Sequence, residues 1–107
     1  MKTFLTVHRN IAGAIHTEPV DGEIIFLHDI PLFIFYDVLC NVWNISHLET
    51  GMKIKTAWKR EDVIKEADKA LSTDKVEEVI EKGRRIIIDY GLKLPLNAMH
   101  RFKVKTA

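Results

Sequence analysis

The chain has 107 residues but only one cysteine, and it contains no long apolar run. The single cysteine, Cys40, excludes a disulfide within the chain, so we expect a reducing and therefore cytoplasmic environment. No stretch approaches the roughly 20 apolar residues that span a bilayer, and the first residues lack the apolar core of a secretory leader. We therefore expect a protein that is neither secreted nor embedded in a membrane.

The sequence also lacks the common catalytic and metal-binding motifs. Its five glycines are isolated, so there is no glycine-rich phosphate loop, and no histidine stands at metal-site spacing from another ligand. The apolar neighbours Leu39 and Val42 favour a small buried Cys40 over a nucleophile. Four side chains near predicted strand ends would form a site only if the fold brought them together: His8, His28, His47 and Asp29. We expect no metal and no cofactor, and we favour a binding protein over an enzyme.

The residues that are present indicate a single α+β domain. A hydrophobic content of 47% is enough for one core without metal or disulfide support. Residues 3 to 58 contain segments that alternate with a period of two and one continuous apolar run, both typical of strands, whereas residues 60 to 71 and 75 to 90 follow the period of a helix. We therefore predict a mostly antiparallel β-sheet of five to six strands, followed by two C-terminal helices packed on one face and a basic tail at residues 98 to 107.

The part of the sheet before residue 40 is predicted to contain four strands, at residues 3 to 8, 14 to 17, 23 to 28 and 32 to 37. The sequence Pro19-Val20-Asp21-Gly22 predicts a turn, because proline fixes φ and glycine supplies positive φ. Pro31 predicts a break, because proline lacks a donor for the strand ladder. The segment after Pro31 has a helical alternative that begins at this proline, although its aromatic and β-branched residues favour a strand.

Residues 42 to 58 are predicted to form a β-hairpin that turns at Thr50 and Gly51. In the preferred register Glu49 faces Met52. This register places the apolar residues of both arms on one face of the hairpin, where they can join a core.

The preferred register also pairs Trp43 with Trp58, and an aromatic pair across two strands is worth roughly 0.2–1 kcal/mol. The alternative is a three-residue loop with a glycine bulge, in which Leu48 faces Met52. That register would scatter the apolar residues over both faces.

The segment of residues 60 to 71 has the clearest helical pattern. Its apolar residues form one stripe: Val63, Ile64, Ala67, Ala70 and Leu71. The second helix is predicted to begin at Asp74, which fits a capping box with Glu77, and to end before Gly91. Its apolar face would contain Val76, Val79, Ile80, Ile87 and Tyr90. Gly83 in its middle indicates a close approach to another element, and the isoleucines at residues 86 to 88 leave a late strand as the alternative.

Charge is divided unevenly along the chain. Residues 1 to 52 carry two basic and six acidic side chains, a net charge of −4, whereas the rest carry fourteen and nine, a net charge of +5. This asymmetry suits attraction to a charged partner or head-to-tail self-association. Basic side chains that would contact the phosphates of a nucleic acid are Lys53, Lys55, Lys59 and Arg60, and then Arg84, Arg85, Arg101 and Lys103.

The hairpin carries the motif W-N-x-S-H-x-x-T-G, from Trp43 to Gly51, and a charged amphipathic helix follows it. Over residues 41 to 71 this pattern resembles small accessory proteins of phages and prophages. The resemblance implies a short protein of a mobile element that binds host or phage proteins, and it implies no catalytic residues. It also implies that His47 and Thr50 shape the turn.

The expected function is therefore that of a non-enzymatic accessory or regulatory protein that binds another protein. An antiparallel sheet leaves an edge strand free, so we also expect that a homodimer can form through a sheet edge. The alternative is a small nucleic-acid-binding module that uses the basic side chains. Neither function involves a membrane.

Overall fold

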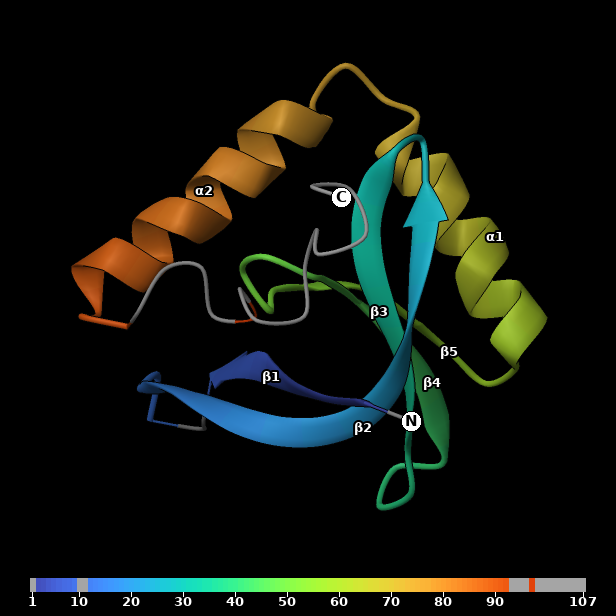
Figure 1. Cartoon of the computed structure of the whole chain (residues 1–107), viewed down its shortest axis with the longest axis horizontal. Coiled ribbons are helices and arrows are strands. Elements are labelled where there is room, and N and C mark those ends of the chain that lie inside the picture. Colours follow the sequence, from blue (N-terminus) through green and yellow to red (C-terminus); the bar gives the residue numbers. More distant parts are fainter. Residues whose placement is uncertain (1, 10–11, 93–96, 98–107) are drawn as a thin grey trace.

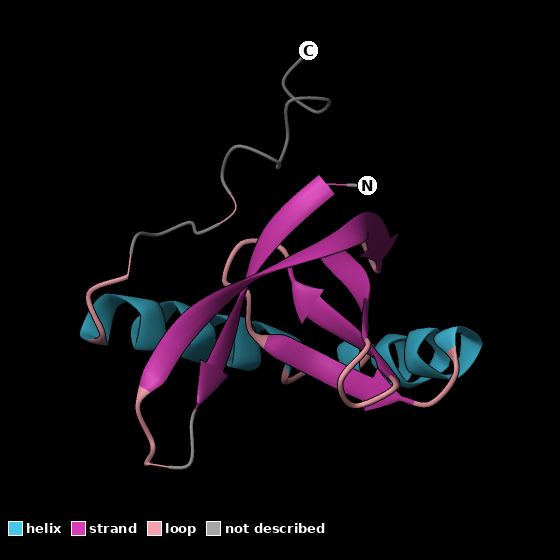
Figure 2. Ribbon diagram, turned by 90° about the horizontal axis from the view of Figure 1, so that it is seen from below, coloured by secondary structure: helices cyan, strands magenta, loops and turns pink. Residues whose placement is uncertain are grey.

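The computed structural model describes residues 2–9, 12–92 and 97 (Figure 1). They form five strands followed by two helices: β1 (Lys2–Arg9), β2 (Ile15–Leu27), β3 (Ile30–Asp37), β4 (Val42–His47), β5 (Lys53–Ala57), α1 (Arg60–Leu71) and α2 (Val76–Asp89). The predicted α+β fold, an antiparallel sheet with two C-terminal helices, is confirmed. Both helices lie at the end of the molecule opposite to the β1–β2 pair (Figures 1 and 2).

The sheet is a meander in the order β1-β2-β3-β4-β5, and each strand is antiparallel to the next. The long strand β2 changes its partner along its length. Its first part, to Gly22, pairs with β1, whereas residues 23–27 pair with β3. The β1–β2 pair therefore runs at a steep angle to β3 and β4, and the sheet curves strongly (Figures 1 and 2).

Gly22 lies where β2 passes from one partner to the other. A Cβ atom at this position would stand 2.5 Å from the carbonyl oxygen of Ile34 and 3.3 Å from the Cβ of Phe35. Only glycine lets the two backbones come this close. The predicted turn at residues 19 to 22 is therefore wrong, and the two short strands predicted on either side of it are one strand.

Pro19 is accommodated inside β2, opposite Leu5 of β1. Since β3 pairs with residues 23–27, the other edge of β2 has no strand partner at Pro19 within the described part of the chain. A proline is tolerated at such an edge, because the hydrogen-bond donor that it lacks is not needed there.

The connection from β2 to β3 is a two-residue turn at His28 and Asp29. Their φ angles of 52° and 62° are the left-handed values typical of a type I′ hairpin turn. Pro31 is already in β3, opposite Phe26, so it makes no break. The prediction of a strand rather than a helix at residues 32 to 37 is confirmed.

The β4–β5 hairpin has a wider loop than predicted. The backbone N–H of His47 donates to the carbonyl oxygen of Met52 at 2.8 Å, and the N–H of Gly51 donates to the carbonyl oxygen of His47 at 2.8 Å. Inside the loop the Thr50 hydroxyl contacts His47 Nδ1 at 3.0 Å and accepts from the N–H of Met52 at 3.3 Å. These side-chain bonds hold a loop from Leu48 to Gly51, and the preferred register with Glu49 opposite Met52 is wrong.

Farther from the loop, a shift between Ile45 and Ser46 changes the pairing by one residue. Ile45 then faces Lys55, as in the alternative register, and Trp43 faces Ala57 instead of Trp58. The predicted aromatic pair is therefore absent, and Trp58 lies beyond the end of β5.

The core has two parts, one on each face of β3. Leu32, Ile34 and Ile45 pack against α1, whose buried residues are Val63, Ala67 and Leu71. On the other face Phe33 stacks on Phe4 with ring centroids 4.9 Å apart, and Phe35 and Leu48 belong to the same cluster. Alternate residues of β3 thus point to opposite faces and both sets are buried, at roughly 1.5–3 kcal/mol for each fully buried side chain.

The helix at residues 60 to 71 is confirmed, and α2 also forms, so the alternative of a late strand is wrong. The predicted capping box is wrong, because the N-cap of α2 is Lys75 and its side chain makes no capping hydrogen bond. The end of α2 is as predicted. Gly91 has a φ of +69°, and the N–H of Leu92 donates to the carbonyl oxygen of Ile87 at 2.9 Å, which makes a Schellman motif.

The face of α2 that packs against the rest of the protein contains Gly83 and Ile87. A Cβ atom on Gly83 would lie 2.9 Å from Met52 Cγ and 3.4 Å from Thr50 Oγ1, so the predicted close approach is to the β4–β5 loop. Val79 and Tyr90 are half exposed, although the sequence pattern placed them on the buried face.

Asn97 fixes a point of the chain after α2 to the sheet. Its side chain is buried; it accepts from the N–H of Leu5 at 2.7 Å and donates to the carbonyl oxygens of Leu5 at 3.0 Å and Leu48 at 2.7 Å. The predicted basic tail at residues 98 to 107 lies outside the described residues. Among the helices of the described part, none is both long and apolar enough to cross a membrane.

Candidate binding surface around Trp58

The histidines that the sequence placed near strand ends do not converge. His28 Nε2 lies 2.9 Å from a carboxylate oxygen of Asp68 on α1, whereas His47 is at the end of β4 and contacts Thr50, and His8 is on β1. In residues 2–9, 12–92 and 97, no group of three or more histidine, cysteine or acidic side chains is placed to hold a metal ion. Cys40 is exposed, so its predicted burial is wrong.

Two of the arginines predicted to contact nucleic acid make contacts within the protein. Arg84 donates two hydrogen bonds to the carboxylate of Glu49, at 2.9 and 2.8 Å. Arg60 lies 3.6 Å from a carboxylate oxygen of Glu23 and 5.9 Å from the ring centre of Trp43. These two arginines therefore hold α2 and α1 against the sheet.

The pair of Glu49 and Arg84 is the best-defined ion pair of the α2 interface. The hydrogen bonds to Glu49 are the main cause of a raised pKa of Arg84; partial burial opposes them, and the attraction of the carboxylate adds to them. Glu49 is 15% exposed and Arg84 is 40% exposed. The pair thus links the β4–β5 loop to α2 in a geometry with two parallel hydrogen bonds.

The remaining basic residues lie in different places. Lys53 and Lys55 are exposed on β5, Lys59 is exposed directly before α1, and Arg85 is exposed on α2. Arg101 and Lys103 lie outside the described residues. The first basic group is exposed on and after β5, whereas most of the second lies outside the described residues or, for Arg84, in an ion pair.

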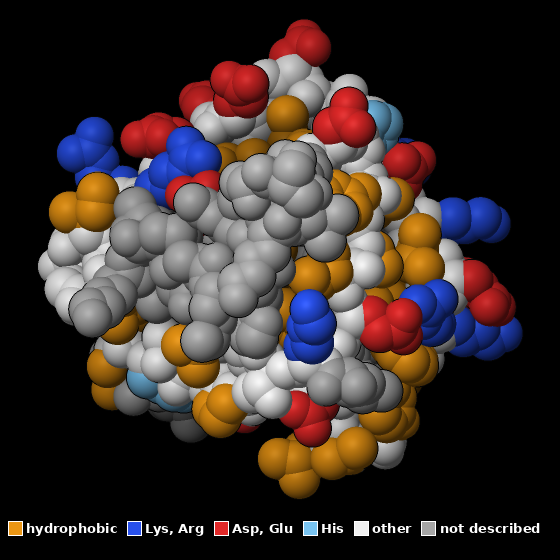
Figure 3. All heavy atoms as spheres, viewed as in Figure 1, with side chains coloured by type: hydrophobic (Ala, Val, Ile, Leu, Met, Phe, Trp, Pro, Cys, Tyr) orange, Lys and Arg blue, Asp and Glu red, His pale blue; other side chains and the backbone are white. Residues whose placement is uncertain are grey.

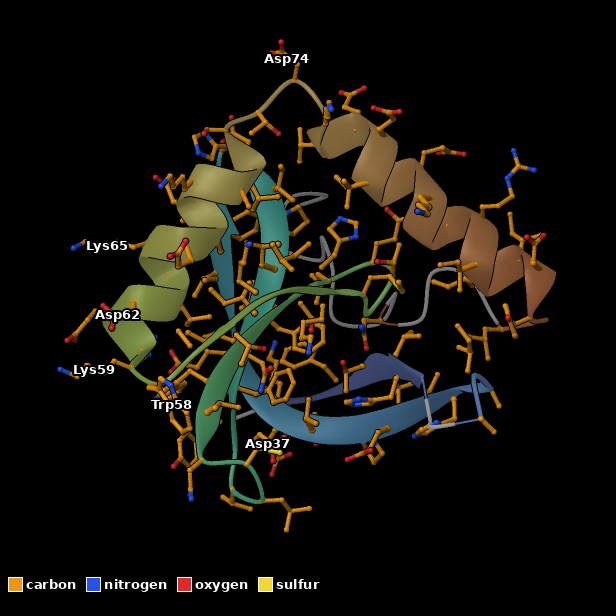
Figure 4. All side chains as sticks on the ribbon, turned by 180° about the vertical axis from the view of Figure 1, so that it is seen from behind. Asp37, Trp58, Lys59, Asp62, Lys65 and Asp74 are labelled. Carbon is orange, nitrogen blue, oxygen red and sulfur yellow. The ribbon has the colours of Figure 1, made fainter. Side chains whose placement is uncertain are left out.

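Trp58 stands in the middle of this basic group and is 75% exposed. It connects the end of β5 to the start of α1, and Figure 4 shows Trp58, Lys59, Asp62 and Lys65 on the same side of the molecule, with Asp74 in the connection from α1 to α2. A large apolar ring in water loses the free energy that burial would give it, roughly 1.5–3 kcal/mol for a side chain of this kind. The Trp58 surface, defined here as Trp58 with Lys53, Lys55, Lys59 and Lys65, is therefore a candidate binding surface.

Two hollows meet at Trp58. The first, of about 590 Å³, lies between β5 and the start of α1, and Lys55, Asp62 and Lys65 line it. The second, of about 690 Å³, lies between β5 and β1, with Thr6 on one side and Thr56 on the other. A partner that covered Trp58 could fill both hollows at once.

At one end of the second hollow, β1 contacts the β4–β5 loop that precedes β5. The N–H of Val7 and the hydroxyl of Thr6 both donate to the carbonyl oxygen of Gly51, at 2.9 and 3.2 Å. β1 does not pair with β5, and among the described residues no strand pairs with the outer edge of β5. The Trp58 surface thus borders a free strand edge.

The sequence indicated three lysines of this surface, at residues 53, 55 and 59, but the role of Trp58 was missed, because the predicted register paired it with Trp43 in the core. The available signal was the position of Trp58, which directly precedes the charged sequence Lys59-Arg60-Glu61-Asp62 at the boundary of strand and helix. A second exposed apolar group, Val38 and Leu39, lies in the β3–β4 loop, where Figure 3 shows hydrophobic side chains at the lower edge of the molecule.

The fold and this surface define a small α+β domain with an exposed tryptophan beside a free strand edge. Comparison of the chain with known protein families, with curated proteins and with solved structures finds no match in any of the three.

Proposed function

We propose that this protein is a non-enzymatic accessory or regulatory protein that binds another protein through the Trp58 surface. The observation that supports this function is the 75% exposure of Trp58 between two hollows. Tryptophan is among the residues that contribute most to protein interfaces, and such residues are usually seated near the centre of the contact.

The free edge of β5 suggests how the partner binds. An extended segment of the partner would pair with the backbone of β5 and place an apolar side chain against Trp58. Lys53 and Lys55 are exposed on this strand and would favour a segment that carries acidic residues.

The same proposal covers the cellular setting. A short accessory protein of a phage or prophage, acting on a host or phage protein in the cytoplasm, fits the motif in the β4–β5 hairpin and the single cysteine. A second copy of the chain is also a candidate to pair with the β5 edge, which would give a homodimer.

Nucleic-acid binding is the second candidate, and one observation favours it. The Trp58 surface combines four lysines with an exposed tryptophan. Many proteins bind single-stranded nucleic acid in this way, with an aromatic ring that stacks on a base and cations that contact the phosphates. Asp62 and Glu66 line the same hollow as Lys65 and oppose this function.

The experiment that tests the proposal is capture of partners from host lysate by the tagged protein and by its Trp58→Ala variant. Tyr90→Ala is the matched control, since Tyr90 is also an exposed aromatic residue but lies at the end of α2. We expect a protein that the original chain and Tyr90→Ala retain after nuclease treatment at moderate salt, and that Trp58→Ala loses. Loss of all bound material on nuclease treatment would favour nucleic acid, and equal capture by Trp58→Ala would refute the role of this surface.

A further inference from the structure

A second, acidic groove lies where β2 and β3 separate, and it does not use Trp58. The pairing of these strands ends at Glu23 and Ile34. Beyond this point β2 turns toward β1, whereas β3 continues along β4 as far as Asp37 (Figure 1). The space between the diverging strands is a groove of about 430 Å³, called here the acidic groove. The polar and aromatic side chains that line it include Glu18, Asp21, Glu23, Tyr36, Asp37 and Trp43.

The lining of the acidic groove is negatively charged. It contains four carboxylates and neither lysine nor arginine among its described residues. Asp21 accepts a hydrogen bond from the hydroxyl of Thr3 at 2.9 Å, and Asp37 accepts from the backbone of the following loop at 3.0 and 3.2 Å. These donors are neutral, so they orient Asp21 and Asp37 and leave the charge of both in place. The other two carboxylates have basic neighbours: Glu23 lies 3.6 Å from Arg60, and Glu18 lies 3.8 and 3.9 Å from Nε2 of His8 and His16. Four carboxylates against one arginine still leave an excess of negative charge. The groove therefore attracts a cation.

The aromatic residues of the groove are suited to the same ligand. The rings of Tyr36 and Trp43 stand edge to face with centroids 5.2 Å apart. Trp43 already has the guanidinium of Arg60 at 5.9 Å from its ring centre, so a cation of the protein itself lies against this ring. Tyr36 is exposed, and its ring is open to a second cation.

The rim of the groove adds an apolar contact. Val38 and Leu39 are 72% and 91% exposed in the loop that follows Asp37. The hydrogen bonds from the N–H groups of Leu39 and Cys40 to Asp37 Oδ1 fix this loop beside the groove. Figure 4 shows Asp37 at this end of β3. Exposed apolar residues beside a charged groove fit a peptide better than a simple cation, because a peptide supplies apolar side chains next to its basic ones.

The backbone of the groove also fits a peptide. Residues 35–37 of β3 pair with β4 on one side, and on the β2 side they have no strand partner among the described residues. An extended segment laid along this edge would pair with β3 and direct alternate side chains into the groove.

We propose that the acidic groove binds an extended basic segment of a partner protein, with an arginine or lysine side chain among Glu18, Asp21 and Asp37 and beside the ring of Tyr36. An apolar residue of the same segment contacts Val38 and Leu39 at the rim. The acidic groove does not use the β5 edge, but it is a neighbour of the Trp58 surface, because Asp37 also lines the second hollow beside Trp58. The groove variant described below alters neither Asp37 nor Trp58, so failure of this proposal can be distinguished from failure of the proposed function.

The test is fluorescence anisotropy with a short labelled peptide of alternating arginine and valine, and with a matched peptide of alternating glutamate and valine. The double variant Glu18→Gln, Asp21→Asn removes two charges from the groove. The control Glu77→Gln, Glu78→Gln removes two charges from the exposed first turn of α2. We expect the arginine peptide to bind, the glutamate peptide not to bind, and the groove variant alone to weaken binding about tenfold.

Three results would overturn the proposal. The first is absence of saturable binding of the arginine peptide. The second is equal weakening by the groove variant and the α2 control, which would mean that net charge alone attracts the peptide. The third is competition by spermidine as effective as that of the unlabelled peptide, which would make the groove a site for a small cation.

Thermal unfolding of each variant verifies that it is folded. Leu39→Ser removes only the rim contact, so it is expected to weaken binding of the arginine peptide with no change of charge.

Discussion

Substitution of Gly22 is the sharpest test of how β2 crosses β3. A methyl group at this position would meet the carbonyl oxygen of Ile34 at 2.5 Å, and this oxygen belongs to the backbone of a strand that is buried on both faces. Overpacking of this kind costs about 1–3 kcal/mol. It exceeds the roughly 0.5–1 kcal/mol that alanine gains over glycine in a regular element. Gly22→Ala is therefore expected to lower the free energy of unfolding, and Gly22→Val to lower it further.

The assay is urea unfolding followed by tryptophan fluorescence, with the midpoint and the slope fitted for each variant. The expected order of stability, glycine above alanine above valine, is the reverse of the intrinsic preference for β-strands. Thr17→Val in the same strand is the control, and we expect it to change the stability by less than about 0.5 kcal/mol. A Gly22→Val variant as stable as the original chain would refute the close crossing of β2 over β3.

Three further predictions concern stability. Asn97→Ala removes a buried side chain that bonds to Leu5 and Leu48, and calorimetry should show a loss of about 2–3 kcal/mol; an unchanged melting temperature would contradict these bonds. Arg84→Met breaks the partly exposed pair with Glu49 and should cost about 1 kcal/mol or less. Folding raises the pKa of Arg84, so the ion pair contributes fully to stability below the ordinary pKa of arginine and is lost only as the pH rises through the raised pKa. The difference in free energy of unfolding between the original chain and Arg84→Met should therefore stay constant from about pH 6 to 10. Trp58→Ala should leave the free energy of unfolding within about 0.5 kcal/mol of that of the original chain, whereas a larger loss would mean that the ring is packed.

The sequence was sufficient where a local pattern and the tertiary structure agree. The helical stripe of α1 and the glycine at the end of α2 each have a local physical cause, and both appear where they were predicted. The strand after Pro31 follows from its aromatic and β-branched residues, which suit a strand that is buried on both faces.

Local signals failed where long-range pairing decides the structure. Pro19 and Gly22 resemble turn residues, but the first tolerates a strand edge and the second allows a close crossing. The register of the β4–β5 hairpin is determined by the contacts of Thr50 with His47 and Met52, which the alternation of apolar residues does not contain.

The candidate sites depend on the same long-range features. Trp58 is exposed because the register excludes it from the pairing, and the acidic groove exists because β2 leaves β3 at Glu23. Both sites combine residues from strands whose relative positions no short motif specifies. The uneven charge of the chain is a signal in the sequence that bears on both sites, since the acidic groove is in the first half and the Trp58 surface is in the second.

The most direct test of the central claim is the affinity of a captured partner, purified, for the original chain, for Trp58→Ala and for Tyr90→Ala. A residue at the centre of an interface typically contributes 2 kcal/mol or more, which corresponds to a dissociation constant weakened about 30-fold. We predict this loss for Trp58→Ala, little change for Tyr90→Ala, and only a modest effect of salt. Equal affinities of the two variants, or an interaction that moderate salt abolishes, would contradict the proposal that the Trp58 surface binds a protein.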